Sequence, residues 1–281
     1  MPVTSATRQK LFLKRFPDFS FNFFFLLKIM KICRFVVNSE IKIGVLEDER
    51  VYLFENNQKS SVYFDRSKIK FLSPVVPSKI VCVGRNYAEH AAELGNEVPK
   101  EPLLFLKAPS ALILDGESIV IPPQSDQVEH EGELAVVIGR KCGNLSDSDN
   151  PDEFIFGYTI LNDVTARDLQ RRDIQFTRAK SFDTFCPIAS FIETDLDTSN
   201  LSLTTRVNGI VKQQGKTSQM VFTVEFLVRY ISRQMTLNEG DIIATGTPSG
   251  VSKLEDADIC EIEIEGIGIL SNPVVKTFPS G

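Results

Sequence analysis

The feature that most constrains the fold is a succession of short, strand-like runs separated by turn residues. From Ile32 onward, runs of apolar and β-branched residues recur about every ten residues, with glycine, proline, asparagine or aspartate between them. This spacing predicts a β-rich α+β chain built as a roll or distorted barrel. Helical periodicity is confined to 86–94, to 223–234 and to a short stretch from Asp163 to Gln170.

The same pattern divides the chain into three regions. Residues 1–29 carry five basic residues, one acidic residue and several phenylalanines, and we interpret them as an extension. This extension is either absent from the native protein, with initiation at Met30, or a targeting segment. Residues 30–75 predict a small N-terminal antiparallel sheet domain, and residues 76–281 a catalytic domain.

Charge and cysteine usage exclude several classes of function. The net charge of −6 argues against nucleic acid as a partner, because phosphate binding needs a concentrated basic face. The five cysteines are widely spaced and form no CxxC pair, which favours a reducing, cytoplasmic location over a disulfide framework or zinc cluster. No apolar run approaches the roughly 20 residues of a transmembrane helix, so no membrane partner is expected.

The segment VEHEGELAVVIG, residues 128–139, carries the first sign of chemistry. In a strand, residues two apart share a face, so Glu129, Glu131 and Glu133 lie opposite His130 and Gly132. Carboxylates leading into an apolar run repel each other unless a cation neutralises them. Oxygen ligands favour Mg²⁺, Mn²⁺ or Ca²⁺ over zinc. Spacing alone leaves open a solvated edge strand whose glutamates pair with lysines.

A third acidic ligand is expected at Asp163, which follows the apolar run GYTILN. On a helix, Asp163, Arg167 and Gln170 would share one face, since they are four and seven residues apart. An ordinary capped helix, with Asp163 as its N-cap and Arg167 on its surface, explains the pattern equally well.

A candidate general base lies in GRNYAEHAAELG, residues 84–95. Asn86 can cap a helix that Gly95 ends, and His90 and Glu93 are then neighbours on one helical face. The chain has only two histidines, so a histidine base must be His90 or His130. The carboxylate of Glu93 could orient His90. A solvated surface pair is the alternative.

Taken in order, these segments resemble the fumarylacetoacetate hydrolase family, including its acylpyruvase and 2-hydroxyhepta-2,4-diene-1,7-dioate isomerase-like members. The resemblance covers about residues 30–276. It rests on the ordered motifs GRNYAEHAAE, LFLKAPSALI, HEGELAVVIG, NDVTARDLQ, KSFDTFCP, VNGIVKQQGKTSQMVF, GDIIATGTPSGV and IEIEGIGILSNPV.

The resemblance implies a β-roll fold with a small N-terminal sheet domain, and a homodimer. It implies that Mg²⁺ or Mn²⁺ is held by Glu131, Glu133 and Asp163, with Glu129 outside the ligand set, at the rim or behind it. It places His90 and Glu93 as a dyad on a mobile lid. Further site residues that it implies are Lys180 and Gln170 in catalysis, and Arg85, Arg167 and Thr247 in substrate binding.

The implied substrate is a small 2-oxo acid or β-dicarbonyl compound. The favoured reaction is cleavage of a C–C bond in an acylpyruvate or fumarylacetoacetate-type 2-oxo acid through a metal-bound enolate. Decarboxylation of an oxaloacetate-type acid and 2-hydroxymuconate-type isomerisation are alternatives at the same site. A non-catalytic metal-binding protein is disfavoured, because it has no need of a poised base. The loops at 95–105 and 171–179 would select the distal part of the substrate.

Overall fold

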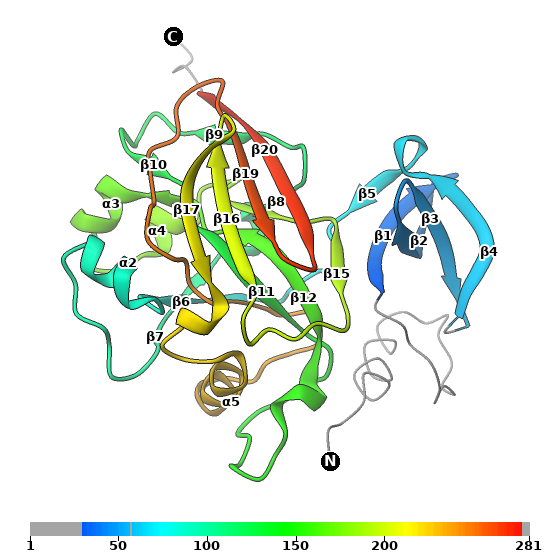
Figure 1. Ribbon diagram of the computed structural model, residues 1–281, viewed down its shortest axis with the longest axis horizontal. Coiled ribbons are helices and arrows are strands. Elements are labelled where there is room, and N and C mark those ends of the chain that lie inside the picture. Colours follow the sequence, from blue (N-terminus) through cyan, green and yellow to red (C-terminus); the bar gives the residue numbers. More distant parts are fainter. Residues whose placement is uncertain (1–29, 57, 277–281) are drawn as a thin grey trace.

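The computed structural model describes residues 30–56 and 58–276. The predicted extension over 1–29 lies outside the described residues. The described chain is strand-rich, with one thirteen-stranded sheet, one five-stranded sheet and a two-stranded ribbon (Figure 1). This architecture confirms the predicted β-rich α+β class. Among these residues, no helix is long and apolar enough to cross a membrane.

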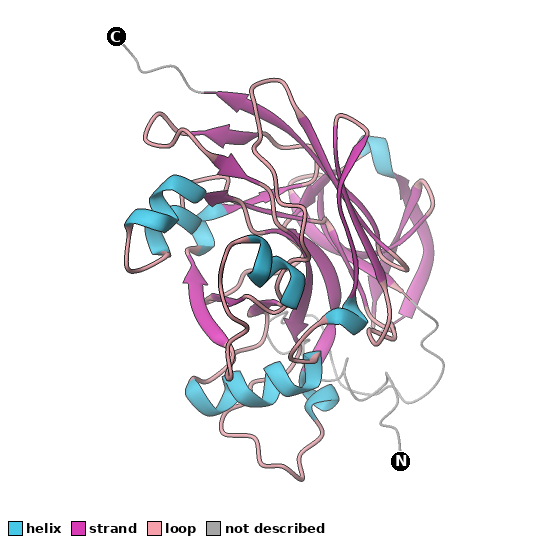
Figure 2. Ribbon diagram, turned by 60° about the vertical axis from the view of Figure 1, so that its left-hand side comes forward, coloured by secondary structure: helices cyan, strands magenta, loops and turns pink. Residues whose placement is uncertain are grey.

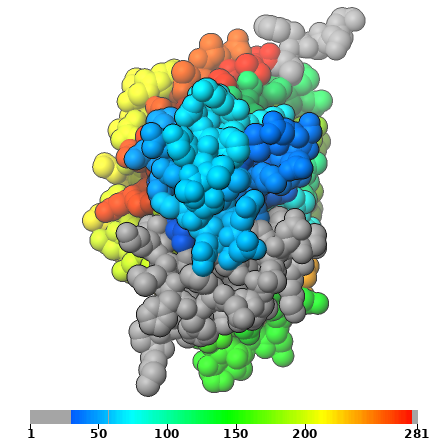
Figure 3. Space-filling view, turned by 90° about the vertical axis from the view of Figure 1, so that its right-hand side faces the viewer, coloured from blue at the N-terminus to red at the C-terminus, as the bar shows by residue number. Residues whose placement is uncertain are grey.

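The first five strands form an antiparallel sheet at one side of the molecule. Its outer face is the blue-to-cyan surface of Figure 3. β1 also pairs with β15, so this sheet continues into the main sheet. The predicted domain division at residue 75 therefore stays a prediction. The strands are β1 (Lys31–Val37), β2 (Glu40–Glu47), β3 (Arg50–Glu55), β4 (Gln58–Asp65) and β5 (Lys70–Leu72), with a 3₁₀ turn η2 (Arg66–Lys68).

The main sheet crosses the centre of the molecule, and every residue of β11 is buried. This explains its continuous apolar run, because both faces of the strand meet apolar neighbours. β11 pairs antiparallel with β12 and β18, and β18 pairs parallel with β6. The remaining strands are β6 (Ile80–Gly84), β7 (Leu103–Lys107), β8 (Leu112–Leu114), β11 (Gly132–Ile138), β12 (Ile155–Asn162), β14 (Cys186–Ile188), β15 (Phe191–Glu193) and β18 (Ile242–Ala244).

The five-stranded sheet packs against β11, and Gly132 marks the closest approach. A Cβ atom at Gly132 would lie 2.5 Å from Thr205 Oγ1 and 3.1 Å from Ile262 Cγ2, so only glycine fits between the layers. The sheet contains β9 (Ile119–Ile121), β16 (Ser202–Val207), β17 (Ile210–Lys216), β19 (Ile259–Ile264) and β20 (Gly268–Lys276), and the ribbon pairs β10 (Val128–Glu129) with β13 (Thr165–Ala166).

Short helices lie around the sheets, and α5 crosses one end of them (Figure 2). Two predicted helices are confirmed: 86–94 contains α2 (Ala88–Glu93), and 223–234 contains α5 (Val224–Gln234). Thr223 caps α5 through its side chain, whereas α2 begins after Tyr87 without a side-chain cap. Asn86 is therefore not a cap. The other helical segments are α3 (Arg167–Arg172), α4 (Thr177–Lys180), η3 (Pro109–Ala111), η4 (Pro151–Phe154) and η5 (Thr217–Gln219).

The predicted helix from Asp163 to Gln170 is wrong at its start. Asp163 follows the end of β12, and Thr165 and Ala166 pair with β10, so α3 begins only at Arg167. Strand pairing here outweighs the local helical spacing. Asp163 thus reaches the site from the end of a strand rather than from a helix face.

Candidate active site

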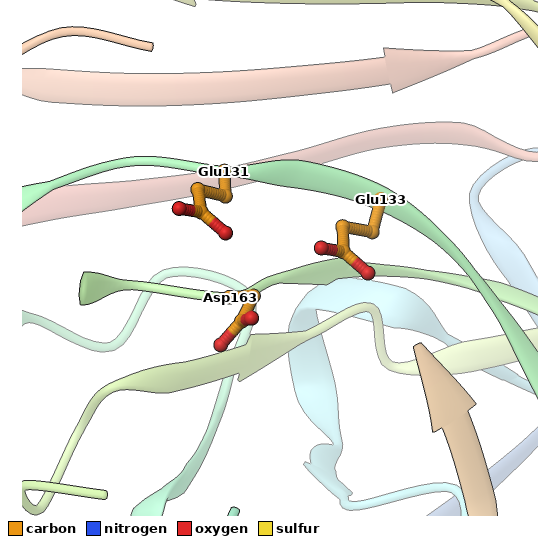
Figure 4. Close-up of side chains that lie close together, drawn as sticks. All are labelled: Glu131, Glu133 and Asp163. Carbon is orange, nitrogen blue, oxygen red and sulfur yellow. The ribbon is translucent and has the colours of Figure 1, made fainter. Parts of the chain in front are cut away.

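Three carboxylates that the sequence singled out lie together in the interior. Glu131, Glu133 and Asp163 are 4%, 2% and 1% exposed, and each offers an oxygen within 4.8 Å of the others. Figure 4 shows the two glutamates extending from one strand segment toward Asp163. A buried acidic cluster of this kind has the oxygen donors that a hard divalent cation prefers.

Backbone pairing fixes this arrangement. Glu131 donates its N–H to Asn162 Oδ1 at 2.9 Å, and Asp163 donates its N–H to the carbonyl of Glu131 at 2.8 Å. Gly132 is paired with Asn162 in the β11–β12 register. The residue that follows β12 is therefore held beside the residue that precedes β11.

Three buried cations surround the carboxylates. Lys180 Nζ donates to Glu131 Oε2 and to Asp163 Oδ2, both at 2.7 Å. Lys107 Nζ donates to Asp163 Oδ1 at 2.7 Å. Arg167 bonds Glu131 and also donates from Nε to Glu129 Oε2 at 2.7 Å. Glu129 thus holds the arginine behind the cluster, and its place outside the ligand set stays a prediction.

The ion pairs in this cluster leave out Glu133, and this tests whether a cation fits. Glu129, Glu131 and Asp163 are each bonded to a lysine or an arginine, whereas Glu133 accepts the N–H of Gly246 at 2.7 Å and has no ion pair among the described residues. Burial, and then the carboxylates of Asp163 and Glu131, raise the pKa of Glu133 well above its ordinary value. For Glu131, burial is outweighed by Lys180 and Arg167, which lower the pKa. A divalent cation would relieve the repulsion at Glu133, so the residues present fit one.

The cluster opens onto a cavity of about 310 Å³. All ten site residues named from the sequence line this cavity, although they come from segments between residues 85 and 247. The structure thus brings every one of them to the same place. The lining residues are Val83, Gly84, Arg85, His90, Glu93, Leu94, Asn96, Leu103, Phe105, Glu131, Glu133, Asp163, Arg167, Gln170, Arg171, Phe176, Lys180 and Thr247.

The dyad residues lie on α2 at the side of this cavity. His90 Nδ1 is 3.2 Å from Glu93 Oε2, and His90 is buried. Glu93 also accepts the N–H of Gly250 at 3.0 Å, so its carboxylate is oriented from a second segment. A bond from Nδ1 to a carboxylate leaves Nε2 of the imidazole as the proton-accepting nitrogen.

The other histidine lies outside the cavity. His130 is fully buried between the sheets, where its ring nitrogens bond Gln213 Oε1 at 3.2 Å and Ser252 Oγ at 2.9 Å. Burial lowers the pKa of His130 to about 4. His90, which the resemblance placed in the dyad, is therefore the histidine that lines the cavity, and His130 does not.

Arg167 and Thr247 line the cavity, but their polar groups are engaged within the protein. Arg167 donates from Nη1 to Gln170 Oε1 at 2.5 Å, in addition to its two glutamate partners. Thr247 Oγ1 donates to the carbonyl of Gly132 at 2.8 Å and accepts from Gln213 Nε2 at 2.7 Å. The bond from Arg167 leaves the amide NH₂ of Gln170 as a donor.

Sequence reasoning missed Lys107, which is 1% exposed and bonds Asp163 directly. A signal was present, because Lys107 ends the apolar strand LLFLK, where a buried lysine needs an acidic partner. Gln213 was also missed. It accepts from Gly132 N at 3.0 Å and Thr205 Oγ1 at 2.9 Å, and so ties β11 to the second sheet. Its position in the polar run IVKQQGK did not indicate that its side chain is buried.

Comparison with known families identifies the family of this chain. The family model described as fumarylacetoacetate (FAA) hydrolase C-terminal matches residues 79–275. The chain belongs to the fumarylacetoacetate hydrolase family. Two named relatives in this family are oxaloacetate tautomerase YisK of Bacillus subtilis, 42% identical over 78% of this chain and 77% of its own, and the mitochondrial oxaloacetate decarboxylase of Dictyostelium discoideum, 46% identical over 67% and 89%.

Solved structures of the fumarylacetoacetate hydrolase family agree with the fold. The 5-carboxymethyl-2-hydroxymuconate delta-isomerase of Mycobacterium smegmatis has a TM-score of 0.81 at 43% identity, covering 89% of this chain and all of its own. The fumarylpyruvate hydrolase of Pseudomonas aeruginosa, solved with Mn²⁺ and pyruvate, has a TM-score of 0.68 at 29% identity, covering 78% and 93%. The named relatives are enzymes, and this chain is an enzyme of the same family.

Proposed function

We propose that this enzyme moves a proton at the carbon next to the 2-oxo group of a short 2-oxo acid of the oxaloacetate type, interconverting its keto and enol forms. The observation that carries the proposal is the cavity that joins the buried carboxylates to the His90–Glu93 pair. The named tautomerase and decarboxylase relatives support it, since both reactions form an enolate whose negative charge lies on the 2-oxo oxygen.

In this proposal, Glu131, Glu133 and Asp163 hold one divalent cation, Mg²⁺ or Mn²⁺. When bound, the cation supplies Lewis-acid stabilisation of negative charge on the 2-oxo oxygen. Lys180 stays protonated and holds Glu131 and Asp163 in place, because these carboxylates outweigh the effect of burial and raise its pKa.

Nε2 of His90 would take the proton from the carbon, and Glu93 would hold the ring through Nδ1. Water would supply the proton that the 2-oxo oxygen gains in the enol. The free NH₂ of Gln170 would donate to the developing oxyanion. For Arg167, the bonds to Glu129, Glu131 and Gln170 support a positioning role, and they leave two N–H groups for the predicted substrate contact. The hydroxyl of Thr247 is already bonded to Gly132 and Gln213. The proposed contact with a substrate carboxylate would therefore come from the backbone N–H of Thr247.

Hydrolysis of an acylpyruvate, which the sequence favoured, is the second candidate. The likeness to fumarylpyruvate hydrolase supports it, and the same dyad could activate a water molecule. The oxaloacetate-type reaction is preferred because relatives of 41–46% identity carry it by name, against 37% and 29% for the two named hydrolases.

One set of assays separates these reactions. Purified protein, stripped with EDTA and reloaded with Mg²⁺ or Mn²⁺, is given oxaloacetate and acetylpyruvate. Enol loss measured by ultraviolet absorbance reports tautomerisation, whereas pyruvate release reports decarboxylation or hydrolysis. We expect metal-dependent enol loss from oxaloacetate that exceeds pyruvate release from either compound. Faster pyruvate release from acetylpyruvate would replace the first proposal with the second.

We also propose a homodimer, and a cytoplasmic or, if residues 1–29 direct it there, mitochondrial location. Analytical ultracentrifugation tests the first point. Imaging of fluorescent fusions with and without residues 1–29 tests the second.

A further inference from the structure

Arg85 differs from the buried cations that line the cavity or bond its carboxylates. Lys107, Arg167 and Lys180 are each bonded to carboxylates. Arg85 lines the cavity and is half-buried, but it has no hydrogen bond or ion pair with any residue in 30–56 or 58–276. A cation withdrawn from water without a partner is unfavourable, so its position suits an anion supplied from outside the protein.

The backbone at Arg85 gives an independent indication. Its φ is +59°, in the left-handed region that arginine rarely adopts. The next residue imposes this conformation, because Asn86 is fully buried and its side chain bonds Phe222 and Thr245. Gly246 packs so closely that a Cβ there would lie 2.7 Å from Asn86 Cβ. Such strain persists where the surroundings enforce it, typically at functional sites.

The neighbouring arginines lack these features. Arg178 is exposed and bonds Asp173 at 2.8 and 2.5 Å. Arg172 is also exposed and does not line the cavity. Arg171 lines the cavity but is exposed, and donates to Gln127 Oε1 at 3.1 Å. The loop at 171–179, which was expected to help select the distal part of the substrate, therefore offers weaker candidates than Arg85.

We propose that Arg85 binds the second carboxylate of a dicarboxylic 2-oxo acid and so makes the site selective for short dianionic substrates. This inference rests on the proposed function, which places the 2-oxo acid end of the substrate at Glu131, Glu133 and Asp163. A cavity of about 310 Å³ is near the small end for ligand sites, and its volume suits one short molecule. A substrate with a neutral tail would leave Arg85 unpaired.

The test compares binding of two unreactive probes to the Mn²⁺-loaded protein by calorimetry. Malate carries the second carboxylate and lactate lacks it. We expect the parent protein to prefer malate on the order of 10- to 100-fold, as for one charge-assisted pair. Arg85→Gly should remove this preference, Arg85→Lys should keep part of it, and Arg172→Gln should leave it unchanged. A preference that survives in Arg85→Gly would overturn the proposal.

Thermal unfolding separates this role from a structural one. Glycine accepts a positive φ freely, so Arg85→Gly should melt at the same temperature as the parent or higher. Arg85→Asn, which tolerates the left-handed region, should behave alike. A lower melting temperature together with equal losses for malate and lactate would assign Arg85 to folding and overturn the proposal.

These measurements also distinguish a failure of the Arg85 proposal from a failure of the proposed function. If the parent protein prefers malate but does not turn over oxaloacetate, the proposed reaction fails and the Arg85 site stands. If it turns over oxaloacetate without preferring malate, the Arg85 site fails alone.

Discussion

Glu131 and Glu133 face the cavity, whereas their neighbours His130 and Gly132 face the second sheet. Both sides are buried, but the means of burial differ. The cavity side is stabilised by charge, with lysines and an arginine around the carboxylates. The sheet side is stabilised by neutral hydrogen bonds and close packing. The difference shows that a segment of four residues, 130–133, directs charged side chains to the cavity and packing contacts to the second sheet by alternating its side chains.

The two histidines extend this comparison. His90 pairs with a carboxylate at the cavity, while His130 is sealed between sheets with an amide and a hydroxyl. Only the first arrangement suits a base that changes its charge during a reaction, because Glu93 can stabilise the imidazolium. Substitutions on the cavity side should therefore change catalysis or metal binding, and substitutions on the sheet side should change stability.

The largest expected effect is on the rate. Replacing His90 with alanine removes the proposed base, and kcat for oxaloacetate enol–keto conversion should fall about 10²- to 10⁴-fold. Stopped-flow absorbance measures this, and calorimetry should find Mn²⁺ binding unchanged. A rate within about tenfold of the parent would exclude His90 as the base.

The next effect is on metal binding. Glu133→Gln removes a proposed ligand, so Mn²⁺ affinity measured by electron paramagnetic resonance should fall by more than about 100-fold. In EDTA the variant should melt at the same temperature as the parent or higher, because the like-charge repulsion at Glu133 is gone. Glu129→Gln is the matched control, with a smaller loss of about tenfold. Equal losses in both variants would contradict the assignment of ligands.

The third effect is on stability as a function of pH. The folded-state pKa of His130 is depressed to about 4, so its contribution to stability is present above the ordinary histidine pKa of about 6.5. It is lost as the pH falls toward 4, because the unfolded chain takes up the proton first, and the loss amounts to about 3 kcal/mol.

Urea unfolding of the parent and of His130→Asn at pH 7 and at pH 4 measures this loss. The free-energy gap between the two proteins should shrink by about 3 kcal/mol over that range. A gap independent of pH would show that His130 is not held neutral in the folded protein.

The smallest effect is from packing. Gly132→Ala inserts a methyl group 2.5 Å from Thr205 Oγ1 and should cost about 1–3 kcal/mol of unfolding free energy. Chemical denaturation measures the cost. Mn²⁺ affinity of the folded fraction should change less than in Glu133→Gln, and the reverse order would show that the two faces are not separable.

Local patterns predicted what local physics controls. Strand spacing predicted the β-rich class, and alternation placed Glu131 and Glu133 together on one face. The helix expected from Asp163 does not begin there, because Thr165 and Ala166 pair with β10, which is distant in sequence. Lys107 was overlooked because its partner Asp163 is 56 residues away and becomes its neighbour only after folding.

By itself, the sequence determined the strand periodicity, the acidic face and, through ordered motifs, the family. Only the tertiary structure decided that His130 is sealed between the sheets, which cations are already paired and that Arg85 has no partner among the described residues. The physical reason is that alternation and helical spacing act over a few residues along the chain. The balance of charge in a buried site depends instead on groups that strand pairing gathers from distant segments.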